Sequence, residues 1–264
     1  MIRILFLGEI IGISTINLFK KSLKGLLLKY SIDFTIANAD GASDGFGILK
    51  NSAFILNKSG IDIITGGDYV FNKKDVKELL GINFFLKPYN LPQYFGGNGY
   101  TLARVKDVEI GIISILGRIH FNKIFASCPF YSVNKAIEKL KEKTKIIIVD
   151  FHGGATSEVQ AMHWYLAGKV SLTVGSHLRM LTTDSRILNN KTAVITGIGF
   201  CGAKNSVGGL EPEIEINKFR SGQHYYSKVA VQEIKVQGVI VDIDESNGEA
   251  KKIEVLDKCI INES

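Results

Sequence analysis

Short apolar runs recur along the chain, and several of them are rich in β-branched side chains. The clearest runs cover residues 2–7, 33–37, 61–65, 109–116, 145–151, 170–174 and 192–196. Runs this short and this continuous are typical of strands that are buried on both faces of a sheet. We therefore predict a strand at each of these positions.

Amphipathic patterns of helical period separate several of the predicted strands. The clearest patterns cover residues 16–30, 52–60 and 128–145. Alternation of strands with helices predicts an α/β fold in which helices cover the sheets.

The last part of the chain has a different pattern. Residues 228–256 indicate consecutive strands around a turn from Glu245 to Gly248, with no helical period between them. We expect an antiparallel hairpin tail that packs onto the rest of the molecule. Because no Pro- or Ser-rich linker interrupts the chain, we predict a single domain over residues 1–264.

The composition is that of a globular protein with a proper core. Hydrophobic residues make up 45% and charged residues 22%, and no apolar run reaches the length of a membrane-spanning helix. The first apolar run is broken by Glu9 and lacks the features of a signal peptide. The three cysteines are far apart and form no CxxC pair. We therefore expect a reducing, cytoplasmic environment and no membrane partner.

The net charge of +6 favours anionic ligands over cationic ones. The lysines are scattered at helical spacing, as in KAIEKLKEKTK, which is typical of a solvated helix face. No recognition module for nucleic acid is visible.

Polar residues and glycines follow nearly every predicted strand. The candidates are Glu9, Asp40, Asp68, Asp150 with His152, and His177. The carboxyl ends of strands form the rim where α/β proteins bind ligands, and glycine lets the backbone approach a ligand closely. Each residue alone is more typical of a helix cap, a turn or a core histidine. Together, carboxylates and imidazoles are the ligand set of Mn²⁺, Fe²⁺ or Zn²⁺.

One of these segments raises a specific question. VGSHLRMLTTD (174–184) places His177 and Arg179 two residues apart, a spacing at which two imidazoles could bind one metal ion. Arginine keeps its proton and cannot be a ligand. The segment is either a metal site that has lost a ligand or one that never bound metal.

These motifs resemble those of the YmdB-like metallophosphoesterases, bacterial members of the calcineurin-type phosphoesterase fold. GEIIG (8–12) resembles the family's Gly-Asp-Ile-Val-Gly, and VDFHGGATSE (149–158) resembles its Val-Asp-Phe-His-Ala-Glu-Ala-Thr-Ser-Glu. The similarity extends from about residue 1 to residue 257. It implies a four-layer αββα sandwich of two mixed sheets flanked by helices. It also implies a two-metal centre at the strand ends and hydrolysis of phosphodiesters, including cyclic nucleotides.

Position by position, the resemblance implies a centre that is only partly intact. His152 and His177 keep the family identity, while Glu9, Asp40 and Asp68 replace an Asp, a bridging Glu and an Asn. All five side chains can still bind a cation. The resemblance implies that Asp40, Asp68, His152 and His177 form one divalent metal site.

Three other departures are more severe. Gly41 replaces an Asn, Tyr69 replaces the histidine expected to assist leaving-group protonation, and Arg179 replaces a histidine ligand. The second metal relied on the positions of Glu9, Asp40, Gly41 and Arg179. We hypothesise that Arg179 and Glu9 together replace this metal and that the guanidinium binds phosphate. We therefore expect about one Fe, Mn or Zn ion per chain, with Tyr69 and Arg179 as candidate catalytic residues.

Two functions remain open at this point. The first is a metal-dependent phosphodiesterase that acts on cyclic nucleotides or other small phosphodiesters. The second is a catalytically degenerate member of the fold that binds a phosphate-containing ligand or a protein partner in a regulatory role. The sequence allows a homo-oligomer without determining one. A dinucleotide-binding fold is disfavoured because the glycine fingerprint in GEIIGIS is incomplete.

Overall fold

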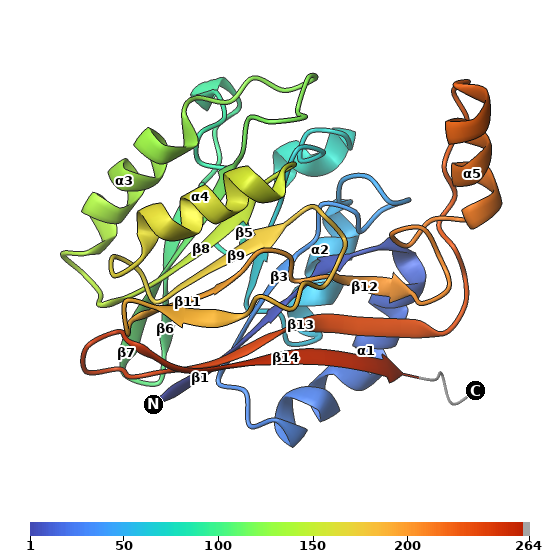
Figure 1. Cartoon of the computed structure of the whole chain (residues 1–264). Helices are drawn as coiled ribbons and strands as arrows, with labels where there is room; N and C mark the ends of the chain where they lie inside the picture. The colour runs from blue at the N-terminus through green and yellow to red at the C-terminus, as the bar shows by residue number, and fades with distance from the viewer. Residues whose placement is uncertain (261–264) are drawn as a thin grey trace.

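The strands of the computed structural model, which describes residues 1–260, form two mixed sheets (Figure 1). The first sheet has the order β2-β12-β13-β1-β3-β4-β5, with β14 paired to β13. Its strands are β1 (Ile2–Leu7), β2 (Glu9–Ile10), β3 (Phe34–Asn38), β4 (Ile63–Thr65), β5 (Phe85–Leu86), β12 (Phe200–Ala203), β13 (Ile234–Ile243) and β14 (Ala250–Ile260).

The second sheet has the order β10-β11-β9-β8-β7-β6. Its strands are β6 (Tyr100–Val105), β7 (Val108–Leu116), β8 (Ile146–His152), β9 (Leu172–Ser176), β10 (Arg186–Leu188) and β11 (Thr192–Ile195). The four inner strands are parallel, and β10 and β6 run antiparallel at the two edges. Each apolar run predicted as a strand is a strand in the structure.

Helices cover the outer faces of the two sheets (Figure 1). They are α1 (Gly12–Lys29), α2 (Lys50–Lys58), α3 (Pro129–Leu140), α4 (Thr156–Leu166) and α5 (Pro212–Ser221), with short 3-10 turns at Lys74–Glu78 and Gln93–Phe95. α1 and α2 pack on the first sheet, and α3 and α4 pack on the second. α5 packs on neither sheet and projects from the body.

Apolar cores between and outside the sheets hold these layers together. The central core lies between the sheets and joins Phe6 and Ile36 of the first to Ile148 and Val174 of the second. The outer cores lie under the two helix pairs, with Phe19 of α1 as one example. The expected αββα sandwich is therefore confirmed.

The expected C-terminal antiparallel hairpin is present in the structure. β13 and β14 pair antiparallel around a turn in which Gly248 N–H donates to the Asp244 carbonyl at 2.7 Å. β13 pairs with β14 along one edge and with β1 and the short β12 along the other, so the hairpin is an integral part of the first sheet. The nearly continuous burial of β13 explains this position, since both of its faces are covered.

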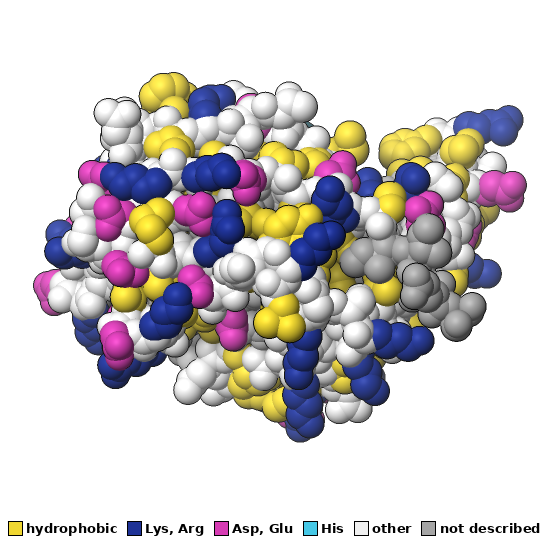
Figure 2. Space-filling model, turned by 90° about the horizontal axis from the view of Figure 1, so that it is seen from below, with side chains coloured by type: hydrophobic (Ala, Val, Ile, Leu, Met, Phe, Trp, Pro, Cys, Tyr) yellow, Lys and Arg dark blue, Asp and Glu magenta, His cyan; other side chains and the backbone are white. Residues whose placement is uncertain are grey.

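The surface gives two further observations. Among the described residues, the helices are too short or too polar to cross a membrane. On the left of the face seen in Figure 2, Lys and Arg side chains alternate with acidic ones, whereas toward the lower right they lie mainly among apolar and uncharged side chains.

Candidate metal centre

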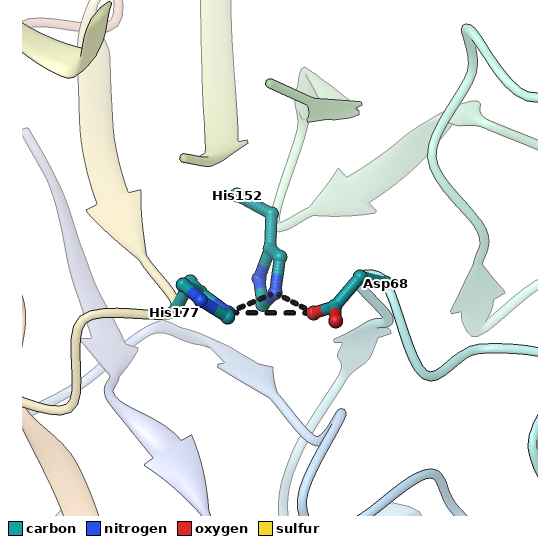
Figure 3. Close-up of side chains that lie close together, drawn as sticks. All are labelled: Asp68, His152 and His177. Atoms are coloured by element: carbon teal, nitrogen blue, oxygen red, sulfur yellow. Dashed lines mark hydrogen bonds and ion pairs between the residues drawn. The ribbon is translucent and has the colours of Figure 1, made fainter. Parts of the chain in front are cut away.

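Asp68, His152 and His177 converge at the carboxyl ends of strands from both sheets. Asp68 follows β4 of the first sheet, His152 ends β8, and His177 follows β9 of the second sheet. The Asp68 Oδ1 atom lies 3.0 Å from His152 Nε2 and 3.3 Å from His177 Nδ1, and the two imidazole nitrogens are 3.1 Å apart. Figure 3 shows the three side chains pointing toward one common position.

The chemistry of these atoms fits one divalent cation. All three ligand atoms lie within 4.8 Å of one another and form a carboxylate and imidazole set. The arrangement therefore provides three candidate ligands for a single ion.

Unusual backbone geometry brings the cluster together. A Cβ atom on Gly67 would lie 2.3 Å from His152 Nε2, so only glycine allows the loop before Asp68 to pass so close to the imidazole. His177 and Arg179 both have positive φ, at 85° and 51°. Such conformations are costly for residues other than glycine, and they cluster at functional sites.

Asp40 lies beside the cluster but is held differently. Its carboxylate accepts hydrogen bonds from the backbone N–H groups of Gly67 (2.6 Å) and Tyr69 (2.8 Å). One carboxylate oxygen is 3.9 Å from His152 Nε2. Asp40, which the resemblance implied as a fourth ligand, therefore lies beside the three converging ligand atoms, and its oxygens also anchor the loop that carries Asp68.

Glu9 and Arg179 form a largely buried ion pair near Asp40. The Arg179 Nη2 atom donates to Glu9 Oε1 at 2.7 Å and to the Gly45 carbonyl at 2.9 Å, and Nη1 donates to the Gly208 carbonyl at 3.2 Å. The guanidinium thus points into the protein rather than into solvent. Burial alone would lower the pKa of Arg179, but the Glu9 carboxylate raises it above its usual value.

Gly41 makes room for this ion pair. A Cβ at position 41 would lie 2.3 Å from the Ile11 Cδ1 atom, 2.7 Å from Glu9 Oε1 and 3.0 Å from Arg179 Nη2. An asparagine at this position is therefore sterically incompatible with the pair. The departures at positions 9, 41 and 179 therefore form one structural unit, in which Gly41 leaves room for the Glu9–Arg179 pair.

A buried hydrogen-bond network, which the sequence analysis did not identify, holds His152 through its Nδ1 atom. His152 Nδ1 lies 2.9 Å from the Ser176 hydroxyl, which donates to Asp150 Oδ1 at 2.6 Å. The other Asp150 oxygen accepts hydrogen bonds from the Asn38 amide (3.0 Å) and the Thr65 hydroxyl. Hydrogen bonds of this kind orient metal-binding histidines. Asp150, one of the strand-end candidates, lies under the cluster rather than in it.

Burial and neighbouring charges shift the pKa values of His152, Asp68 and Asp40. Burial alone would lower the pKa of His152, but the hydrogen bond to Asp68 and the nearby Asp40 raise it to about 9. Burial alone would raise the pKa of Asp68, but His152 and His177 hold it well below its usual range. Burial raises the pKa of Asp40 to about 7, against the opposing effect of His152.

A cleft of about 460 Å³ opens beside Asp68. Its lining includes Tyr69 and Phe121, and Phe121 also packs against both histidine rings of the cluster. Burial and the Asp68 carboxylate raise the pKa of Tyr69, so this phenol keeps its proton at neutral pH. Phe121 had no signal in the sequence, because it lies in a loop without strand or helix period.

Two other titratable residues, His163 and Cys201, are buried away from the cluster. His163 of α4 is buried, and its Nε2 atom lies 3.1 Å from the Ile195 carbonyl. Burial lowers the pKa of His163 to about 4, which keeps it neutral. Burial raises the pKa of the Cys201 thiol to about 12, as expected of an inert core cysteine.

The fold is that of the metallophosphoesterase-like phosphatases. The chain belongs to the YmdB-like protein family, whose model matches residues 5–256. It is 32% identical over 253 residues to a 2',3'-cyclic-nucleotide 2'-phosphodiesterase of Bacillus subtilis (strain 168), and the match covers 96% of this chain and 95% of that protein.

Solved structures agree with this assignment. A phosphatase from Mycoplasma pneumoniae has a TM-score of 0.91 and 28% identity, over 98% of this chain and 93% of that one. A protein from Thermus thermophilus has a TM-score of 0.90 and 25% identity, over 98% of this chain and 99% of that one.

The raised pKa of His152 predicts a pH-dependent stability for the metal-free protein. The pKa of His152 is 6.5 in the unfolded chain and about 9 in the folded protein. Protonated His152 therefore stabilises the folded protein fully below pH 6.5, and this stabilisation is lost as the pH rises through about 9. We expect the melting temperature of chelator-treated protein to fall by about 5 °C or more between these values. His152→Gln should flatten this slope. If the melting temperature of the variant fell equally with pH, the pH dependence could not be assigned to His152.

Removing the Asp150 carboxylate should weaken both the fold and the cation site. Asp150→Ala leaves the Asn38, Thr65 and Ser176 donors without their acceptor, at a cost on the order of 3–5 kcal/mol in the free energy of unfolding. Metal affinity should fall about 10- to 100-fold. Urea titration and metal titration measure the two effects. The matched control is Asp107→Ala, whose side chain is 98% exposed, and it should change neither.

Proposed function

We propose that the protein is a phosphodiesterase that uses one divalent transition-metal ion to hydrolyse cyclic nucleotides or other small phosphodiesters. The observation that carries the proposal is the convergence of Asp68, His152 and His177 beside the inward-facing ion pair of Glu9 and Arg179. The Bacillus subtilis relative, which is named for activity on 2',3'-cyclic nucleotides, supports this substrate class.

Asp68, His152 and His177 would bind the ion, with Asp40 next to them. A divalent cation there supplies Lewis-acid charge to a phosphoryl group. The Ser176 and Asp150 network holds the His152 ring in a fixed orientation. Since an imidazole must lose its proton to become a ligand, the raised pKa of His152 makes cation binding compete with protons.

Arg179 provides permanent positive charge where the resemblance implied a second cation. Glu9 fixes the guanidinium by a 2.7 Å bond, and two backbone carbonyls accept from the same group. A guanidinium has five N–H donors, so it retains donors for a phosphate oxygen. Its charge stabilises the negative charge that develops on a phosphoryl group.

Tyr69 can bind phosphate but is a poor acid. Its phenol lines the cleft beside Asp68, and its raised pKa keeps the proton in place. The phenol can therefore donate a hydrogen bond to a substrate oxygen. It transfers a proton less readily than an imidazole near neutral pH, so leaving-group protonation is the weakest step in this site.

The departures from the family pattern at Tyr69 and Arg179 also favour a second candidate function. A protein that binds one ion and a phosphate-containing ligand without turnover would also need Arg179 and Tyr69 as phosphate contacts, and would not need a good proton donor. Turnover of 2',3'-cyclic AMP and of a generic diester by the metal-loaded protein separates the two functions. Hydrolysis that depends on Asp68 supports the enzyme, and tight binding without hydrolysis supports the binding protein.

Metal analysis tests the ligand assignment directly. Protein stripped with a chelator and reloaded with Mn²⁺, Fe²⁺ or Zn²⁺ should retain about one ion per chain. Asp68→Ala or His177→Ala should abolish retention, because each removes one of three converging ligands. Asp107→Ala and His224→Ala are matched controls outside the cluster and should retain the ion. Unchanged retention in both cluster variants would reject the assignment.

The interdependence of positions 9, 41 and 179 gives a second test. Gly41→Asn alone should destabilise the protein, because its side chain meets Glu9 and Arg179. The triple variant Glu9→Asp, Gly41→Asn, Arg179→His should recover stability and bind about two ions per chain. Adding Tyr69→His should raise diester turnover about 100-fold or more by restoring a proton donor. A triple variant that is no more stable than Gly41→Asn would contradict the coupling.

A further inference from the structure

The function proposed above assigns no role to an arm that projects from the body of the protein. The arm comprises residues 212–227, which include α5, and it stands away from both sheets (Figure 1). Its two legs are hydrogen-bonded at the base, where Ala230 N–H donates to the Gly209 carbonyl and Glu211 N–H donates to the Lys228 carbonyl, both at 2.9 Å. Beyond this base, α5 has little support from the body.

The arm exposes large apolar side chains. Within α5 only Glu215 is buried, whereas Phe219 is 86% exposed and Ile216 is 50% exposed. Tyr226 in the returning leg is also 86% exposed. In Figure 2 the same projection stands out at the upper right and carries apolar side chains.

Such a helix needs a partner to be stable. Isolated helices shorter than about 12–15 residues are marginal in water, and most helical stability comes from packing of an apolar face. α5 has 10 residues. Exposed apolar patches of this kind mark interaction surfaces.

We propose that the arm is a homodimer contact in which α5 packs antiparallel against α5 of a second copy of this chain. Glu213, Ile216 and Arg220 follow one another at helical spacing on one face, with the acid in the first turn and the base in the last. A two-fold axis across Ile216 sets each Glu213 beside the Arg220 of the other copy. Glu215 and Lys218 already pair within the helix at 2.8 Å and leave Glu213 and Arg220 for this contact.

The apolar area is adequate for such a dimer. A whole aromatic side chain buries about 150–250 Å², so the exposed parts of Phe219, Tyr225 and Tyr226 offer on the order of 300–500 Å² of apolar area per chain. The apolar share of an interface is roughly 56–65%. A standard interface buries about 800 Å² per partner. A two-fold contact uses one self-complementary patch on both copies, as this arm provides.

The dimer contact is continuous with the candidate active site. Gly208, next to the first leg, accepts a hydrogen bond from Arg179 through its carbonyl (3.2 Å). At the base of the arm, a Cβ on Gly45 would lie 2.8 Å from Leu210, and a Cβ on Gly12 would lie 2.4 Å from Val229. Packing of the arm against a second copy therefore also restrains the carbonyl that positions the guanidinium.

Sedimentation velocity of the full chain over a micromolar concentration series tests the proposal. The protein should sediment as a dimer, and Phe219→Glu should weaken dimerisation at least about 30-fold. Phe125→Glu is the matched control, because Phe125 is 87% exposed elsewhere on the surface, and it should leave the dimer unchanged. Circular dichroism should report the same fold for all variants.

A charge exchange tests the antiparallel geometry. Glu213→Arg should weaken the dimer by placing like charges together, and Glu213→Arg with Arg220→Glu should restore it. A wild-type chain that stays monomeric throughout the series would overturn the proposal. A dimer that is unaffected by Phe219→Glu, or a charge exchange that restores nothing, would overturn it equally.

Discussion

The buried carboxylate of Asp150 connects the two sheets at the point on which the candidate site depends. It accepts hydrogen bonds from Asn38 and Thr65 of the first sheet and from Ser176 of the second. A buried carboxylate is costly unless its oxygens are paired, so these donors also fix how the sheets lie relative to each other. His152 lies directly above this network and receives its orientation from it. Burial of the apolar core between the sheets holds them together, and the hydrogen bonds of Asp150 fix their position relative to each other.

The candidate site is built from both sheets and combines three possible cation ligands with a permanent charge of the protein itself. The first sheet contributes Asp68, and the second contributes His152 and His177. Arg179 occupies the neighbouring region with a permanent charge that Glu9 balances. This charge cannot dissociate, unlike a second metal ion, and Gly41 is the residue that leaves space for it. Steric contact therefore makes the residues at positions 9, 41 and 179 interdependent, although they lie far apart in the chain.

Most of the fold followed from local pattern. Continuous β-branched runs predicted the buried strands, because a strand covered on both faces has no polar side. The pattern did not indicate the edge strands β6 and β10, nor the projecting helix α5, whose apolar face has no cover within the described part of the chain. It also did not place β13, since a hairpin pattern is the same for a peripheral tail and for a central strand.

The sequence by itself determined the buried strands with long apolar runs, the glycine-flanked polar residues at their ends, and the chemical types available to hold a cation. These are local properties of residue type and spacing. Only the tertiary structure decided which ends meet, that Asp40 anchors a loop, that Asp150 lies beneath the cluster, and that Arg179 points inward to Glu9. Contacts between residues far apart in the chain depend on how the two sheets pack, and no local period encodes that packing.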